Sequence, residues 1–129
     1  MQSFPISAAA IRDCTECARL LVGQLGKHGV DASADQLSRL LEAVVANEGR
    51  GFVLLARVDK RIVGVAYAAT ILSAEHNGLV AWLEELYVIP SHRSRGIGSA
   101  LLAAVIERAE QTGVVAIDLE VDAGHSLAE

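Results

Sequence analysis

The sequence lacks the features that mark membrane, secreted or nucleic-acid-binding proteins. Its 129 residues contain no apolar run of the roughly 18 residues that a membrane-spanning helix needs. The segment from Met1 to Ala10 has neither the basic start nor the apolar stretch of a secretory signal. Acidic residues outnumber basic ones by 16 to 11, which argues against a nucleic-acid surface. We therefore expect a cytoplasmic protein with no membrane or nucleic-acid partner.

Cysteine is scarce, and the two that are present lie close together. Cys14 and Cys17 stand three residues apart within a segment of helical apolar spacing. A redox or metal half-site is one interpretation, but no further cysteine exists to complete a zinc site. We expect instead two small residues packed on one side of a helix, and no metal.

Small and aliphatic residues are abundant. Hydrophobic residues make up 52% of the composition and charged residues 21%, which provides for a buried core and argues against disorder. Aromatic residues reach only 4%, so the core is expected to be aliphatic. A chain of this length suits one domain, and residues 1–129 are expected to fold as a single unit.

The pattern of apolar residues predicts helices and strands along most of the chain. Helical spacing occurs in the segments 11–26, 34–46 and 97–111. Strand-like runs occupy the segments 1–7, 52–58, 61–73, 79–89 and 114–121. Short loops join the three middle strands, which are therefore expected to be antiparallel, whereas a helix before the last strand makes it parallel to its predecessor. The expected fold class is α/β: a mixed sheet with helices on its faces.

The stretch from Trp82 to Leu102 joins a long strand to a helix through a basic loop that contains glycine. The loop reads Arg-Ser-Arg-Gly-Ile-Gly over residues 93–98, and Ser99 adds a hydroxyl in the first helical turn. A helix N-terminus carries unpaired N–H groups and a partial positive charge. Glycine lets a ligand approach the backbone, and arginine adds forked donors. Together these features predict a pyrophosphate site.

Two common phosphate-binding motifs do not match this loop. A P-loop requires a lysine that is absent here, and a dinucleotide fingerprint requires a third glycine where Ser99, Ala100 and Leu101 stand. A tight strand-to-helix turn that binds no ligand is one alternative. A site for a free phosphate ligand such as ATP is another.

The residues of this stretch resemble a known family. The pattern Arg-x-x-Gly-x-Gly, preceded by Glu-Leu-Tyr-Val-x-Pro and followed by a small-then-aliphatic helix, resembles the acetyl-CoA-binding motif of the GNAT N-acetyltransferase superfamily. The expected order of elements is also similar to that family's acyl-CoA N-acyltransferase fold. The segment 82–90, Trp-Leu-Glu-Glu-Leu-Tyr-Val-Ile-Pro, is close to the branch that acetylates diamines and polyamines.

The resemblance implies a role for each part of the motif. Backbone groups of Leu86, Tyr87 and Val88 would pair with the pantetheine arm like an added strand, and one amide would polarise the thioester carbonyl. The pyrophosphate would be held by the loop and the helix start, which comprise Arg93, Ser94, Arg95, Gly96, Ile97, Gly98 and Ser99. The cosubstrate would be acetyl-CoA, and the acceptor would be a primary amine of a small molecule.

Direct attack of an amine on the thioester requires a base, because the ammonium form must first lose a proton. Glu84 and Glu85 are the candidates, and strict alternation along a strand places them on opposite faces. Glu84 would share its face with Trp82 and Leu86, and Glu85 would share the other face with Leu83. The diamine-acetylating branch has its base at the position of Glu84, which makes Glu84 the first choice and Glu85 the second. Either could instead be an ordinary strand residue.

The end of the chain departs from the family pattern. Family members continue with a helix whose tyrosine protonates the leaving thiolate, followed by two more strands, whereas Ser126 to Glu129 only form a capping box. Tyr67 and Tyr87 lie in other elements. The strand 114–121 would then have an unpaired apolar edge. A truncated chain, a second subunit that covers the edge, and a non-catalytic acyl-CoA-binding relative are three explanations; we expect a homodimer.

Overall fold

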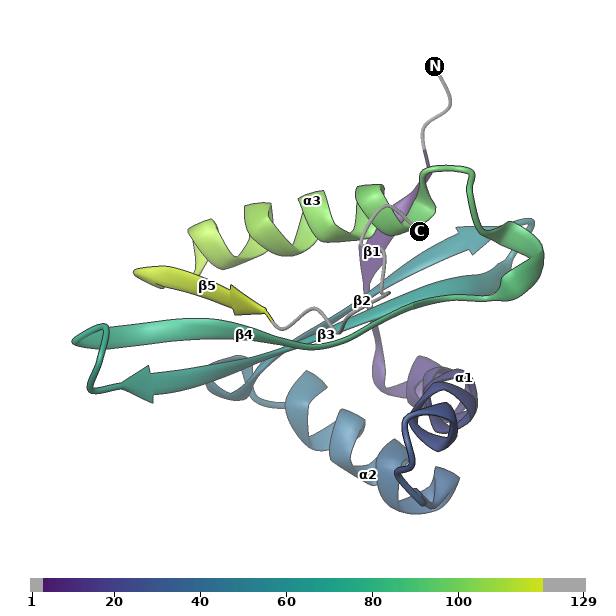
Figure 1. Cartoon of the computed structure of the whole chain (residues 1–129), viewed down its shortest axis with the longest axis horizontal. Coiled ribbons are helices and arrows are strands. Elements are labelled where there is room, and N and C mark those ends of the chain that lie inside the picture. Colours follow the sequence, from purple (N-terminus) through teal and green to yellow (C-terminus); the bar gives the residue numbers. More distant parts are fainter. Residues whose placement is uncertain (1–3, 120–129) are drawn as a thin grey trace.

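The computed structural model describes residues 4–119, which form one five-stranded sheet with helices on both faces (Figure 1). The strands are β1 (Ile6–Ala8), β2 (Gly51–Val58), β3 (Arg61–Ser73), β4 (Gly78–Val88) and β5 (Ala116–Leu119). The α-helices are α1 (Cys14–Lys27), α2 (Ala34–Val45) and α3 (Ile97–Gln111). Short 3-10 turns occur at η1 (Ile11–Asp13), η2 (Glu48–Arg50) and η3 (Pro90–His92). The predicted fold class, an α/β mixed sheet, is confirmed.

The strands follow one another across the sheet in the order β1-β2-β3-β4-β5. The first four are antiparallel, and Asp59 and Lys60 form the turn between β2 and β3 with positive φ at both positions, as two-residue hairpin turns require. Helix α3 then carries the chain back, so that β5 pairs with β4 in parallel. The described pairs join β5 to the first part of the long β4 strand, from Val80 to Leu83 (Figure 1).

Two apolar layers cover the sheet, one on each face. Alternating residues of β2 divide between them: Leu54 packs in the layer under α3, whereas Val53 and Leu55 pack in the layer under α1 and α2. In Figure 1, α3 lies on one side of the sheet and α1 with α2 on the other. The predicted placement of helices on both faces of the sheet is therefore correct. The site described below lies along β4, which has the two layers on its two faces.

A glycine in β3 allows α3 to rest close to the sheet. A Cβ atom added at Gly64 would lie 2.8 Å from Leu101 Cδ1 and 3.3 Å from Ile97 Cγ2. Ile97 and Leu101 belong to the first turns of α3 and are both buried. The start of α3 is thus seated directly against the bare backbone of β3, which fixes its distance from the sheet.

Most predicted elements are present, with small shifts at their ends. α2 begins after the predicted N-cap Ser33, whose Oγ accepts a hydrogen bond from the amide of Gln36 at 3.2 Å. The predicted N-terminal edge strand is formed by Ile6–Ala8. Residues 120–121 of the last predicted strand and the capping-box segment 126–129 lie outside the described residues.

Both cysteines are buried on α1 as free thiols, as the sequence led us to expect. Burial raises the pKa of the Cys17 thiol to about 12, and the nearby Cys14 and Asp13 act in the same direction. Burial also raises the pKa of Cys14. Because the thiolate is the reactive form, both cysteines serve packing.

No group of metal-binding side chains occurs within the described residues. Over the same residues, none of the helices has the length and apolar character to cross a membrane.

Candidate active site

The loop between β4 and α3 has the backbone shape of an anion site. Ser94 has a φ of +64° and Gly96 a φ of +87°, so two of its residues adopt the left-handed conformation. Gly96 is the N-cap of α3, and glycine takes this conformation without steric cost. Turn conformations of this kind align successive N–H groups around an anion.

The first turn of α3 adds further donors. The first intrahelical bond runs from the amide of Ala100 to the carbonyl of Gly96 at 3.0 Å. The amides of Ile97, Gly98 and Ser99 therefore have no acceptor inside the helix, and they carry the positive end of its dipole. Loop and helix start together provide the donors that a pyrophosphate group requires.

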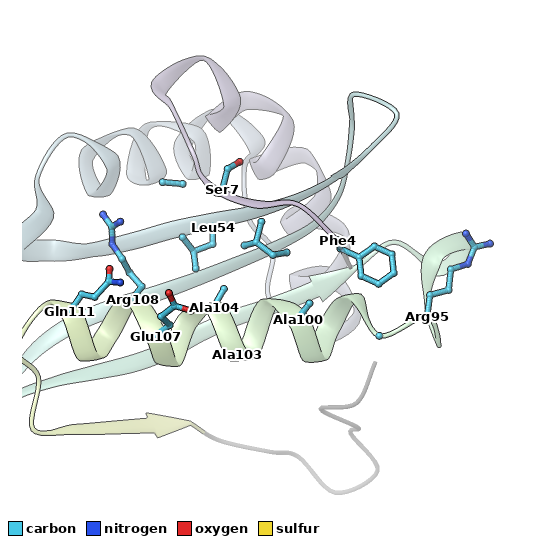
Figure 2. Close-up of a pocket in the computed structure, with 13 residues that line it drawn as sticks. Phe4, Ser7, Leu54, Arg95, Ala100, Ala103, Ala104, Glu107, Arg108 and Gln111 are labelled. Atoms are coloured by element: carbon cyan, nitrogen blue, oxygen red, sulfur yellow. The ribbon is translucent and has the colours of Figure 1, made fainter. Parts of the chain in front are cut away.

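The two arginines of the loop have different surroundings. Arg93 Nε donates a hydrogen bond to the carbonyl of Val88 at 2.8 Å, and its guanidinium carbon lies 5.4 Å from the centroid of the Tyr87 ring. Arg93 therefore ties the loop to the end of β4, partly through a cation–π contact. Arg95 is exposed, and Figure 2 shows its side chain beyond the N-terminal end of α3. Arg95 is thus the loop arginine whose charge is more accessible to a ligand.

β4 contains a bulge at Glu84. In the ladder with β3, Glu85 pairs with Tyr67 and Leu83 pairs with Ala68, so Glu84 is an extra residue. The extra residue interrupts the strict alternation of side chains. That alternation was the basis for predicting which face of the sheet Glu84 and Glu85 each point to. The expectation that Glu85 shares a face with Leu83 is wrong, because Leu83 packs in the layer under α3 whereas Glu85 contacts α1.

Glu85 meets a residue that the sequence did not single out. Its Oε1 accepts a hydrogen bond from Gln24 Nε2 at 2.8 Å, and both side chains are half-buried. Gln24 lies near the end of α1, 61 positions earlier in the chain. No local pattern connects the two residues, and only the packing of α1 across the sheet brings them together.

Glu84 is exposed, and not enclosed by the apolar surroundings that its strand pattern suggested. Its charge nevertheless reaches Tyr67. Burial raises the pKa of the Tyr67 phenol, and the negative charge of Glu84 raises it further. Tyr67 is therefore a protonated phenol at neutral pH, and it packs in the layer under α1 and α2.

The described pairs between β4 and β5 cover only the part of β4 before the bulge. The parallel ladder ends where Leu83 pairs with Leu119, and within residues 4–119 no strand pairs with this side of β4 farther along. Leu86 and Tyr87 pair with β3 on the other side. The segment Leu86–Val88, predicted to hold the pantetheine arm, thus has one edge that no described strand occupies.

A groove of about 660 Å³ lies elsewhere, between α3 and β1 (Figure 2). Ala100 and Ala104 form part of one wall, and Phe4 and Leu54 part of the other. Among the predicted site residues only Arg95 and Gly96 reach it, at one end. The groove is therefore separate from both glutamates and from the Leu86–Val88 edge.

With fold and site described, the family can be stated. The chain belongs to the acetyltransferase (GNAT) family, whose sequence profile matches residues 16–128. Acetyl-CoA is the usual cosubstrate of this family, whose members acetylate small-molecule or peptide acceptors. The sequence matches no curated protein.

Solved structures share the fold. A putative acetyltransferase from Arthrobacter sp. FB24 is 29% identical with a TM-score of 0.78, over 95% of this chain and 77% of that one. A predicted acetyltransferase from Clostridium acetobutylicum, solved with acetyl-CoA, is 18% identical with a TM-score of 0.81, over 98% and 86%. A possible acetyltransferase from Clostridium difficile 630 is 20% identical with a TM-score of 0.80, over 94% and 81%.

Proposed function

We propose that the chain transfers the acetyl group of acetyl-CoA to a primary amine of a small molecule, with Glu84 as general base. The observation that carries this proposal is the bulge in β4. It makes Glu84 an extra, exposed carboxylate on β4, two positions before the segment Leu86–Val88 that would hold the pantetheine arm. The base would thus lie on the same strand as the backbone groups that hold the thioester.

The cosubstrate would bind along two features of the described residues. The pantetheine arm would pair with the open edge of Leu86–Val88. The pyrophosphate would accept hydrogen bonds from the amides of Ser94 to Ser99, with Arg95 adding charge. Arg93 would hold the loop in place through Val88 and Tyr87. Bound in this way, acetyl-CoA supplies an activated thioester.

The reaction needs one proton acceptor and one oxyanion donor. Glu84 would take a proton from the acceptor's ammonium group, directly or through a water molecule. The neutral nitrogen would then attack the carbonyl carbon, so that a C–N bond forms, the C–S bond breaks, and coenzyme A leaves as a thiolate that takes up a proton. An amide of Leu86–Val88 would stabilise the negative charge on the carbonyl oxygen.

The Glu84→Gln variant tests this role. It is expected to lower kcat by about 100-fold or more, because the amide cannot accept the proton. The dissociation constant of acetyl-CoA, measured by calorimetry, should stay unchanged. Glu85→Gln is the matched control, and with a simple monoamine it should keep the wild-type kcat. The opposite pattern, with Glu85→Gln inactive and Glu84→Gln active, would assign the base to Glu85.

A second candidate function is a non-catalytic acyl-CoA-binding or assembly module. It is supported by the positions of Tyr67, which packs in the layer under α1 and α2, and Tyr87, which packs against both layers and lies beneath the Arg93 guanidinium. Neither is placed as the tyrosine that usually protonates the thiolate. Tight acetyl-CoA binding with no turnover of polyamines, amino acids or aminoglycosides would support this second function.

The acceptor is proposed to be a diamine or polyamine. The segment 82–90 resembles that branch, and two adjacent carboxylates at the bulge favour a cationic acceptor. A homodimer and a cytoplasmic location remain predictions. Sedimentation of the intact chain at several concentrations tests the first.

A further inference from the structure

The hairpin of β3 and β4 exposes apolar side chains at its tip. Figure 1 shows the end of β3 and the start of β4 projecting beyond α2 and α3. Leu72 is 81% exposed at this tip, and its neighbour Ile71 and its cross-strand partner Leu79 are exposed as well. Val115 is also exposed and lies against Gly78. Four of the eight exposed large hydrophobic residues among residues 4–119 thus gather at one place, as on surfaces that bind another protein.

β3 also has an unpaired edge at this tip. β2 pairs with β3 only as far as Ala69, so within residues 4–119 no strand pairs with that side of residues 70–73. The carbonyl of Leu79 accepts a hydrogen bond from the amide of Val115, and it therefore points away from β3. In an antiparallel ladder this makes Leu79 and its partner Leu72 a pair without mutual hydrogen bonds. The N–H and C=O of Leu72 consequently point outward from the edge of the sheet.

The sequence of β3 does not protect this edge in the usual way. Natural edge strands commonly carry charges or proline, which prevent pairing with another chain. After Arg61, β3 has no charged residue and no proline, and its last four residues are Thr-Ile-Leu-Ser. An apolar edge with outward N–H and C=O groups fits one type of partner, which is another extended strand.

The charges beside the edge favour the same segment of a second copy as that strand. Two identical strands make the same contacts only in antiparallel pairing, across a twofold axis. With Leu72 opposite Leu72 of the second copy, Glu75 of the second copy is level with Ala69, where β2 begins. Arg50 directly precedes this start of β2. Arg50 and Glu75 are both exposed, and neither forms an ion pair within residues 4–119. The register thus brings opposite charges together twice.

We propose that the tips of two β3–β4 hairpins pair across a twofold axis and join the sheets of two copies. The N–H of Leu72 in each copy donates a hydrogen bond to the Leu72 carbonyl of the other. The side chains of Leu72 and Leu79 share one face of the hairpin and pack against their counterparts. Arg50 pairs with Glu75 of the second copy. The proposal names the surface of the predicted homodimer and does not depend on the proposed acetyl transfer.

Sedimentation of the intact chain at several concentrations tests the surface. Wild-type protein is expected to be a dimer. Leu72→Lys should raise the dissociation constant of the dimer by about 100-fold, because it removes two leucines from the interface and places like charges opposite each other. Leu40→Lys is the matched control: Leu40 is 45% exposed on α2, and its replacement should leave the dimer intact. A monomeric wild type, or equal effects of the two variants, would overturn the proposal.

A charge exchange tests the twofold register. Arg50→Glu and Glu75→Arg each place like charges together at two symmetric points, and each should raise the dissociation constant by about tenfold. The double variant restores opposite charges and is expected to recover the wild-type dissociation constant. Because the two residues form no ion pair within one copy, this recovery reports a contact between copies. Additive weakening in the double variant would contradict the proposed pairing.

The dimer and the acetyl transfer fail in different experiments. None of the sedimentation measurements uses acetyl-CoA or an amine, so loss of the dimer leaves the proposed reaction untouched. A dimer that is disrupted by Leu72→Lys in a protein that acetylates no amine would refute the reaction and support the surface.

Discussion

Cys17 illustrates how strongly the packing of α1 controls a single side chain. Its thiol is buried, and burial raises its pKa to about 12. In the unfolded chain a cysteine titrates near pH 8.5. A thiol that ionises more readily when unfolded stabilises the native state below the unfolded pKa, and this contribution is lost as the pH rises toward the folded pKa.

We therefore expect the free energy of unfolding to fall as the pH rises from about 9 toward about 12, by up to about 1.4 kcal/mol for each pH unit and each such thiol. Urea denaturation at a series of pH values measures this slope. Cys17→Ala should reduce the slope, because it removes the titrating group. An unchanged slope in that variant would show that other groups cause the pH dependence.

Individual residues of the site differ in how far the sequence could predict them. The loop from Arg93 to Gly98 was predictable, because its left-handed positions and helix start depend on residues adjacent in sequence. The facing of Glu85 was not, because a bulge depends on how two strands pair. Gln24 gave no signal at all, since its partner lies 61 positions away and nothing near Gln24 distinguishes it from an ordinary helix residue.

Helix α3 owes its position to a missing side chain on β3. Gly64 leaves room for Leu101 and Ile97, and these residues begin the helix whose first amides face the predicted pyrophosphate site. The site therefore depends on a contact that lies beneath the helix and that never touches the ligand.

Gly64→Ala is expected to destabilise the protein by about 1–3 kcal/mol, because a methyl group 2.8 Å from Leu101 Cδ1 overpacks the core. It should also raise the KM for acetyl-CoA, because the side chains of Leu101 and Ile97 that must give way belong to the first turns of α3. Gly23→Ala is the matched control: this helical glycine has no atom near an added Cβ, so alanine should stabilise α1 by roughly 0.5–1 kcal/mol. Thermal unfolding compares the two variants, and equal effects of both would contradict the packing argument.

At the scale of the whole molecule, the residues of the proposed site come from both faces of the sheet. The loop with Arg93 and Arg95 leads into α3 on one face, whereas Glu85 contacts α1 on the other. β4 passes between them, and within residues 4–119 no strand pairs with the edge of Leu86–Val88 that faces away from β3. In the proposed function, the cosubstrate and the acceptor would reach β4 from opposite sides.

Acetyl-CoA should stabilise the whole domain, because it binds only the folded state. At a concentration 100 times its dissociation constant the gain is about 2.7 kcal/mol, which thermal unfolding detects as a higher Tm. ATP carries phosphates but no pantetheine arm, and is expected to raise the Tm less. Stabilisation by ATP and not by acetyl-CoA would favour a phosphate site unrelated to coenzyme A.

The architecture was predictable from the sequence because each connection restricts its strands. Short loops made β2, β3 and β4 antiparallel, and a helix made β5 parallel to β4. The start of β5 was less predictable: the apolar run began at residue 114, but the strand begins at Ala116. Backbone pairing with β4 determines where that strand begins, and the pattern of apolar residues does not indicate this position.

The bulge at Glu84 also determines which face of the sheet each later side chain of β4 points to. With one residue fewer, Leu86 and Val88 would turn their side chains toward α1 and α2, and Glu85 and Tyr87 would turn theirs toward α3. Glu85 would then face the apolar layer under α3, and the Arg93 guanidinium would lose its contact with the Tyr87 ring. The number of residues before Leu86, as much as their identity, is therefore part of what this sequence encodes.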